Sequence, residues 1–250
     1  MRANFALGAS ATAAALLLLP AIAVAQQQPT EPGWPLPIQN NPILGYASLN
    51  QNELRIGDGT TYRWDGEGWY GGNLNRLWVK SEGNLETSSG ATNEAEVQAL
   101  YSRAISPFFN LQLGVRYDFD PTPSRGWAAF GVEGLAPLGW DIDAFVFASD
   151  GGYLGARLEG YYNLYLTQRL VLQPQFELNA YSRADRPTRT GTGLSDADFG
   201  LRLRYQIRRE FAPYIGVTYA TVYGSSADFA RETGHSISEL RFVVGIHAWL

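Results

Sequence analysis

The sequence contains no cysteine, so neither a disulfide framework nor a thiolate metal site can form. It has one methionine, Met1, and two histidines, His235 and His247. Lys and Arg together number 19 against 24 Asp and Glu, and no basic stripe is present. Because a nucleic-acid-binding surface must neutralise phosphates, we expect no nucleic acid as a partner. No segment shows a sustained helical period, which leaves strands as the expected secondary structure.

The long apolar run of the chain lies near its N-terminus, from Ala11 to Leu19. Arg2 precedes this run, and Ala23-Val24-Ala25 follows it as a small-x-small cleavage site. The run is too short to cross about 30 Å of hydrocarbon as a helix. Residues 1–25 are therefore predicted to be a secretory signal peptide rather than a membrane anchor.

The next two segments precede the large domain predicted for residues 68–250. Residues 26–45 are rich in Gln and Pro and cannot bury much apolar surface, so a flexible periplasmic arm is expected there. Residues 46–67 contain the turn signal Gly57-Asp58-Gly59 between two short alternating segments, which indicates an N-terminal hairpin. The sequence leaves open whether this hairpin joins the domain predicted for residues 68–250.

From residue 68 onwards, apolar and polar residues alternate with a period of two. Leu201 and Leu203 share one face of such a segment, while Arg202 and Arg204 share the other. The segments are longer than the roughly five or six residues of soluble strands and match the roughly nine to eleven that cross a bilayer. We expect ten strands, with twelve as the alternative, near 68–80, 94–105, 109–119, 126–135, 139–148, 153–166, 170–181, 196–208, 212–223 and 239–250.

The connections between the expected strands alternate strictly in length. Short turns, such as the one at Arg209-Glu210-Phe211, are separated by longer polar loops near 81–93, 120–125, 149–152, 182–195 and 224–238. This is the layout of an outer-membrane barrel with its short turns in the periplasm, and a soluble β-sandwich, the alternative, has no reason to keep it. The predicted fold is an all-β, antiparallel, up-and-down transmembrane β-barrel surrounded by the lipid of a bacterial outer membrane.

The polar faces of these strands carry many charged residues. A barrel of about ten strands is narrow, so we expect these charges to pair across a plugged lumen rather than to line an ion path. For Arg202 the expected partner is an acidic residue such as Glu177 on the preceding strand. The predicted lumen network is Arg116, Asp118, Glu133, Arg157, Glu159, Glu177, Asp198, Arg202, Arg204 and Arg241, with Asp141 and Asp143 on the same face.

The two histidines are the candidate metal ligands. His235 lies in the last long loop near Asp228 and Glu232, and His247 has lumen parity close to the periplasmic end. Imidazole suits Cu(II) and Zn(II), but a selective site needs several ligands. A solvated loop histidine and a hydrogen-bonded lumen histidine are the alternatives. With neither a Gly-x-Ser-x-Gly elbow nor a metal-spaced histidine pair, no enzymatic activity is expected.

Several segments, in order over roughly 45–250, resemble the bacterial copper resistance protein B family. They are Gly66–Gly72, Leu77–Gly83, Leu100–Ile105, Gly114–Asp118, Leu166–Leu170, Gly193–Asp196, Arg202–Tyr205 and Ile207–Tyr214. The resemblance implies an outer-membrane barrel in copper homeostasis that binds, sequesters or exports excess copper. It also implies copper as the metal and a periplasmic copper oxidase as a partner.

The chain departs from that family in its N-terminal segment. Family members typically carry a region rich in Met and His, whose side chains suit Cu(I) and Cu(II). Residues 26–45 contain neither residue type. This departure motivates the second hypothesis, a structural or small-solute outer-membrane barrel without a metal role.

Overall fold

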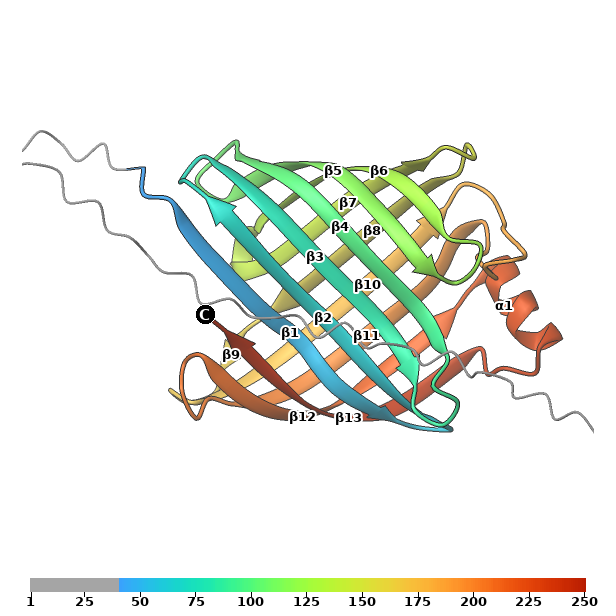
Figure 1. Ribbon diagram of the computed structural model, residues 1–250. Coiled ribbons are helices and arrows are strands. Elements are labelled where there is room, and N and C mark those ends of the chain that lie inside the picture. The colour runs from blue at the N-terminus through green and yellow to red at the C-terminus, as the bar shows by residue number, and fades with distance from the viewer. Residues whose placement is uncertain (1–40) are drawn as a thin grey trace, which may run out of the picture. The chain divides into compact units, whose positions relative to one another are not determined.

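The computed structural model describes residues 41–250 (Figure 1). The predicted signal peptide, 1–25, and nearly all of the predicted arm, 26–45, lie outside the described residues. The strands are β1 (Leu44–Ile56), β2 (Thr60–Gly71), β3 (Asn75–Glu86), β4 (Thr92–Ala104), β5 (Phe109–Asp120), β6 (Arg125–Leu135), β7 (Trp140–Ser149), β8 (Leu154–Tyr162), β9 (Leu164–Tyr165), β10 (Leu170–Tyr181), β11 (Gly193–Tyr205), β12 (Phe211–Val222) and β13 (Ser238–Trp249). A 3-10 turn, η1 (Pro137–Gly139), and one helix, α1 (Gly224–Glu232), complete the elements.

These strands form a closed, antiparallel, up-and-down barrel. Each strand pairs with its neighbours along the chain, and β1 closes the sheet by pairing with β13, for example through Leu54 opposite Val244. β8 and β9 are two parts of one barrel strand that breaks at Asn163, and both pair with β10. The barrel therefore has twelve strands. The alternative count of twelve is right and the expected ten is wrong.

The two additional strands come from the N-terminal part of the described chain. The predicted hairpin at 46–67 corresponds to β1 and most of β2, so the barrel starts at Leu44 rather than at residue 68. The expected strand at 68–80 is instead the end of β2 and the start of β3, joined by a turn in which the Gly72 amide donates to the Asn75 carbonyl at 2.9 Å. A turn this short does not interrupt the alternation of apolar residues, so the sequence pattern hides it.

Because the side chains of a strand alternate with a period of two, one set points to the outer wall of the barrel and the other points into the lumen. Leu201 is 42% exposed on the outer wall, whereas the adjacent Arg202 is 1% exposed inside the barrel. The outer wall carries large apolar residues such as Leu113, Val115 and Phe242. Because the bilayer supplies the apolar surroundings, the interior is free to hold charged residues.

The connections differ at the two ends of the barrel. One end has only short turns, including 166–169 and 206–210, and the opposite end has the longer 182–192 and 223–237. The opposite end also has connections as short as 57–59, 121–124 and 150–153, so the expected strict alternation in length is wrong for these connections. α1 lies at this second end (Figure 1), where Ser226 Oγ accepts a 2.7 Å hydrogen bond from the Gly191 amide. Within residues 41–250 no helix is long and apolar enough to cross a membrane.

Candidate functional site in the barrel lumen

Four carboxylates form a first acidic row on the wall made by β2 to β5. Asp65 lies opposite Glu82, Glu82 opposite Glu96, and Glu96 opposite Asp118. Directly opposed residues on antiparallel strands point to the same face of the sheet. Glu96 is 2% exposed, which places this face in the lumen.

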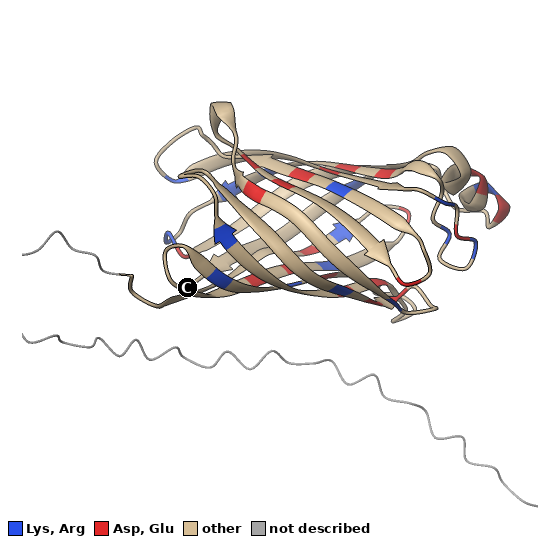
Figure 2. Cartoon of the chain, turned by 90° about the horizontal axis from the view of Figure 1, so that it is seen from above, with Lys and Arg blue, Asp and Glu red and all other residues tan. Residues whose placement is uncertain are grey.

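Five more carboxylates form a second acidic row on the wall made by β6 to β11. Glu133 lies opposite Asp143, Asp143 opposite Glu159, Glu159 opposite Glu177, and Glu177 opposite Asp198. Like charges directly opposite each other are destabilising. The two acidic rows therefore require cations between them, and Figure 2 shows acidic (red) and basic (blue) positions on the strands of the barrel.

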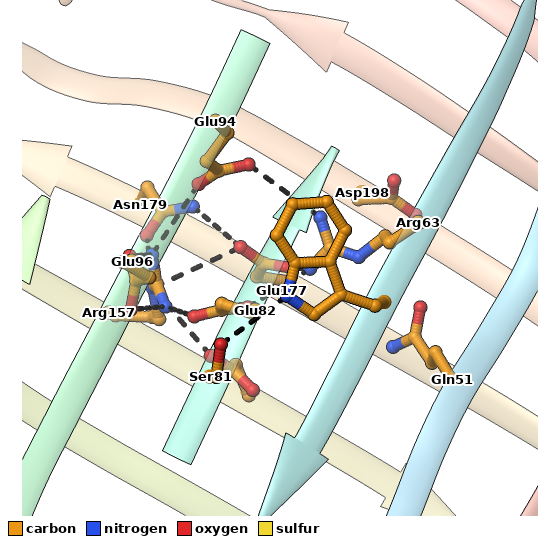
Figure 3. Close-up of polar contacts among 12 residues, drawn as sticks. Gln51, Arg63, Ser81, Glu82, Glu94, Glu96, Arg157, Glu177, Asn179 and Asp198 are labelled. Carbon is orange, nitrogen blue, oxygen red and sulfur yellow. Dashed lines mark hydrogen bonds and ion pairs between the residues drawn. The ribbon is translucent and has the colours of Figure 1, made fainter. Parts of the chain in front are cut away.

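Arg157 crosses the lumen to meet the first acidic row. It stands on β8, and its Nη2 lies 3.0 Å from Glu96 Oε2 on β4. Its Nη1 donates to Glu82 on β3, while its Nε donates to Asn179 Oδ1 at 2.9 Å (Figure 3). The bonds to Glu82 and Glu96 span the channel, whereas Asn179 lies on β10, the strand paired with β8.

Arg63 makes the reciprocal connection from the other wall. Its Nη2, on β2, lies 2.9 Å from Glu177 Oε2 on β10 and 3.2 Å from Glu82 Oε2 on β3 (Figure 3). We call Arg63, Glu82, Glu96, Arg157 and Glu177 the ion-pair belt. The ion-pair belt links both acidic rows across the middle of the lumen.

Lys80 neutralises part of the second row nearer the short-turn end. Its Nζ lies 2.5 Å from Asp143 Oδ2 and 3.5 Å from Glu133 Oε2. Gln112 also donates its Nε2 to Glu133. One ammonium group is therefore shared between two carboxylates of adjacent strands.

A separate cluster joins β1 to β11 and β12 on the lumen side of the same wall, with β13 between β1 and β12. Arg202 donates from Nε to Glu53 Oε2 at 2.8 Å and from Nη2 to Glu53 Oε1 at 2.7 Å. The Tyr214 hydroxyl donates to Glu53 at 2.9 Å, and Arg55 Nη1 donates to Asp198 at 2.7 Å. The recorded acidic partner of Arg202 is thus Glu53 of β1, not Glu177, because the N-terminal strands complete the barrel.

The other predicted lumen residues also lie inside the barrel. Arg116 pairs with Glu96 at 2.5 Å and with Asp118 at 2.6 Å. Arg204 donates to Asn163 rather than to a carboxylate. Arg241 pairs with the adjacent Glu239 at 2.5 Å.

The sequence prediction missed the basic and acidic residues of the first four strands. Glu53 and Arg63 lie in the hairpin whose place was left open, and Glu82 lies in a stretch expected to be a loop. The sequence does contain a signal for these lumen residues. Glu94, Glu96 and Gln98 alternate with apolar residues in β4, and this alternation indicates a polar, lumen-facing side of the strand.

Two cavities lie on either side of the ion-pair belt. The cavity at the end that carries α1 has a volume of about 440 Å³ and includes His235 in its lining. The cavity toward the short turns has a volume of about 340 Å³ and is lined by residues that include Glu67, Asp141 and His247. The two candidate histidines therefore belong to different cavities and cannot bind one ion together.

Each histidine has its own surroundings. His235 is exposed, and its Nδ1 lies 2.8 Å from Thr233 Oγ1. His247 is half-buried, and its Nδ1 has no hydrogen-bond partner among the described residues. Neither histidine is joined by the several nitrogen ligands that a selective imidazole site would need.

The short-turn cavity contains oxygen atoms that lack hydrogen-bond partners. Gln98 is 5% exposed and lines this cavity, yet its Oε1 accepts no hydrogen bond from any described residue. Asp143 Oδ1 in the same lining is also buried and unpartnered. At the inner end, Glu82, Glu159 and Glu177 offer carboxylate oxygens within 4.8 Å of one another. Carboxylate and amide oxygens in this arrangement suit a divalent cation.

Comparison with known proteins assigns the chain to a family. The family described as "Copper resistance protein B precursor (CopB)" matches residues 43–250. A copper resistance protein B homolog of Pseudomonas syringae pv. tomato is 47% identical over 213 residues, which are 85% of this chain and 72% of that protein. Copper resistance protein B of Escherichia coli is 44% identical over 213 residues, 85% of this chain and 71% of that protein.

A solved structure supports the fold independently. The NanC porin superposes with a TM-score of 0.54 at 14% identity, covering 81% of this chain and 98% of the porin. At this identity the likeness concerns the barrel fold alone. The family match over residues 43–250 includes all the segments that resemble copper resistance protein B, so that resemblance is confirmed. The chain belongs to the copper resistance protein B family.

Proposed function

We propose that this chain contributes to copper resistance from the outer membrane of a Gram-negative bacterium by holding divalent copper in its lumen. Family membership supports the copper role. The observation that supports the mechanism is the pair of acidic rows, which place one carboxylate on each of nine barrel strands.

The ligand chemistry of the lumen favours Cu(II) over Cu(I). Cu(I) prefers thioether and thiolate ligands, but the sequence has no cysteine and its one methionine is Met1. The lumen offers carboxylate and amide oxygens together with the His247 imidazole. At nitrogen and oxygen sites of this kind Cu(II) has the highest affinity among the divalent first-row metals.

The short-turn cavity is the best place in the lumen for such an ion. Glu67 and Asp141 line it, and neither forms an ion pair within 4 Å in the part of the chain that the structure describes. The Lys80 ammonium already occupies the space between Glu133 and Asp143. A divalent ion bound beside Lys80 would use Glu67 and Asp141, which form no ion pair of their own there.

The ion-pair belt argues against the rival function of an open small-solute channel. Arg157 and Arg63 cross the lumen from opposite walls, so a neutral solute would have to break several buried charge pairs to pass. A structural barrel with no metal role stays as the second candidate, and the titration below separates it from the first.

The test is a Cu(II) titration of the purified full-length chain by calorimetry, with Cu(I) titrated anaerobically for comparison. We expect Cu(II) binding at least about 10-fold tighter than Cu(I), and a loss of at least about 10-fold in the variant Glu67→Gln/Asp141→Asn, because oxygen ligands are removed. The matched control is Asp228→Asn/Glu232→Gln, which removes two carboxylates from exposed α1 and should leave binding unchanged. Binding that is absent, or equally weakened by both variants, would reject the lumen site.

A growth assay tests the role in the cell. Deletion of the gene should lower tolerance to copper and leave tolerance to zinc and nickel unchanged. The deletion strain should recover with the unmodified gene but not with Glu67→Gln/Asp141→Asn. Unchanged growth across copper concentrations would favour the structural barrel.

A further inference from the structure

Three arginines gather on two adjacent short turns. The turn 166–169 carries Arg169, and the turn 206–210 carries Arg208 and Arg209. The two turns touch, because the Gln206 amide donates to the Arg169 carbonyl at 2.7 Å. We call Arg169, Arg208 and Arg209 the basic turn cluster.

Few acidic residues surround the basic turn cluster. All three arginines are exposed, and Glu210 is the one acidic residue in the described short turns. None of the three arginines forms an ion pair within 4 Å in the described part of the chain. The three guanidinium groups thus outnumber the one carboxylate of these turns and form no ion pair with it.

Three arginines at the opposite end of the barrel form ion pairs with carboxylates of the chain itself. Arg125 pairs with buried Asp185 at 2.6 Å, Arg186 pairs with Glu232 at 3.2 Å, and Arg231 pairs with Asp228 at 2.6 Å. Arg183 and Arg189 of the 182–192 connection form no ion pair within 4 Å in the described chain, and Arg183 lies 5.2 Å from the centroid of the Tyr153 ring. The basic turn cluster differs from them in gathering three exposed, unpaired arginines on two touching turns.

The basic turn cluster also borders the entrance to the lumen. Arg209 lines the short-turn cavity together with Trp249, whose Nε1 donates to the Arg209 carbonyl at 2.8 Å. Bilayer headgroups surround the outer wall of a barrel, whereas this arginine faces the opening. A partner that approaches along the barrel axis therefore fits Arg209 better than a lipid does.

We propose that the basic turn cluster is the docking surface for an acidic periplasmic protein. Arginine is favoured at protein interfaces because its planar guanidinium binds carboxylates through two hydrogen bonds. Complementary charge also steers association and sets the orientation of the partner at the mouth. The basic turn cluster repels a free cation from the acidic lumen, and a docked acidic surface removes that barrier. This consequence rests on the proposed function, whereas the docking itself needs only an outer-membrane location with the short turns in the periplasm.

The test is cross-linking in cells that express the full chain with p-benzoylphenylalanine in place of Gln168, which adjoins Arg169. We expect a cross-linked periplasmic protein whose surface carries a cluster of Asp and Glu. The variant Arg208→Glu/Arg209→Glu should reduce the cross-link at least about 10-fold, because two attractive charges become repulsive. Lys substitutions in the acidic cluster of the captured protein should restore it.

The control variant is Arg103→Glu. Arg103 is exposed at the same end of the barrel, on β4, but shares the outer wall with Tyr101, which is 45% exposed. Arg103→Glu should leave the cross-link intact. A phospholipid adduct as the sole product, no adduct, or a protein adduct that persists in Arg208→Glu/Arg209→Glu would overturn the proposal.

Two further measurements keep the outcomes distinguishable. Heat-modifiable gel migration establishes that each variant is folded, and Arg208→Gln/Arg209→Gln serves as the milder change. Cu(II) titration of the unmodified purified chain tests the lumen site separately from the docking. If the unmodified chain fails to bind Cu(II), the lumen mechanism fails, and the cross-link alone then decides the docking.

Discussion

Arg202 and Glu53 form the most deeply buried ion pair among the described residues, with side chains that are 1% and 0% exposed. Replacing Arg202 with Met removes the bidentate partner of the Glu53 carboxylate and leaves Arg55 Nε, 2.7 Å from Glu53 Oε1, as its remaining cation. Removing one member of a buried pair costs about 3–5 kcal/mol when the other charge is left uncompensated. Because Arg55 stays, we expect the free energy of unfolding to fall by about 3 kcal/mol, the lower end of that range, in urea titrations of the barrel in detergent micelles.

Two other variants check the cause of this loss. Glu53→Gln combined with Arg202→Met should recover part of the stability, because no buried charge is then left uncompensated. Arg186→Met breaks an exposed pair with Glu232 and should cost no more than about 1 kcal/mol. Equal losses for Arg202→Met and Arg186→Met would contradict the buried-pair argument.

Leu201 tests the assignment of the outer face. It is 42% exposed on the wall that meets lipid. Leu201→Arg should therefore cost about 2–4 kcal/mol if the position lies near the bilayer midplane, and less toward an interface. Leu201→Phe should be tolerated, because lipid accommodates a larger side chain that a packed core would resist by about 1–3 kcal/mol. Heat-modifiable migration and urea titration in phospholipid bilayers measure both. A barrel that tolerates Arg at this position but not Phe would mean that the faces are inverted.

The faces of individual residues followed from the sequence, but their partners did not. Strand alternation places Arg157 and Arg202 in the lumen from a local pattern alone. Their partners Glu96 and Glu53 lie 61 and 149 residues away in the chain. Such pairs depend on how many strands close the barrel, because that number sets which walls face each other.

Among the elements, α1 makes a local and testable contact. Ser226 of α1 is 5% exposed, and its Oγ accepts the Gly191 amide at 2.7 Å. Ser226→Ala leaves that buried donor unsatisfied, at a cost of about 1–3 kcal/mol. Hydrogen exchange at the Gly191 amide should then speed up roughly 5- to 150-fold, while exchange in the strands stays unchanged.

The control for this change lies in the same loop. Ser236 is exposed, and its hydroxyl makes only a long 3.5 Å contact with Asp58. Ser236→Ala should leave exchange at Gly191 as it is. If Ser226→Ala also speeds exchange throughout the barrel strands, α1 stabilises the whole fold and the contact is not local.

The errors at the element scale have a common cause. The turn from Gly72 to Leu74 connects two strands without disturbing the alternation, so β2 and β3 were merged into one expected strand. β3 also continues to Glu86, through polar residues that read as a loop. Polar lumen residues such as Glu82 weaken the apolar signal of a barrel strand, and they do so most where the site is richest in charge.

At the scale of the whole molecule, charge is sorted between three regions. The outer wall carries apolar residues such as Phe242, the lumen carries the acidic rows, and the short turns carry the basic turn cluster. The composition, with five more acidic than basic residues, gives no hint of this separation. Only the closure of β1 on β13 brings the acidic rows to face the basic residues of the opposite wall.

Orientation in the membrane is the prediction that depends on the whole molecule. Barrels of the outer membrane keep short turns in the periplasm and long loops outside. Here β1 starts and β13 ends at the short-turn end, and twelve strands return the chain to the side on which it began. A cysteine at exposed Pro187, in the 182–192 connection, should thus react with a membrane-impermeant maleimide added to intact cells. A cysteine at exposed Gln168, in the 166–169 turn, should react only after the outer membrane is opened. The native chain has no cysteine, so it provides an unlabelled background for both variants. Labelling at 168 but not at 187 in intact cells would reverse the topology, and it would move the basic turn cluster to the cell exterior, where no periplasmic protein could reach it.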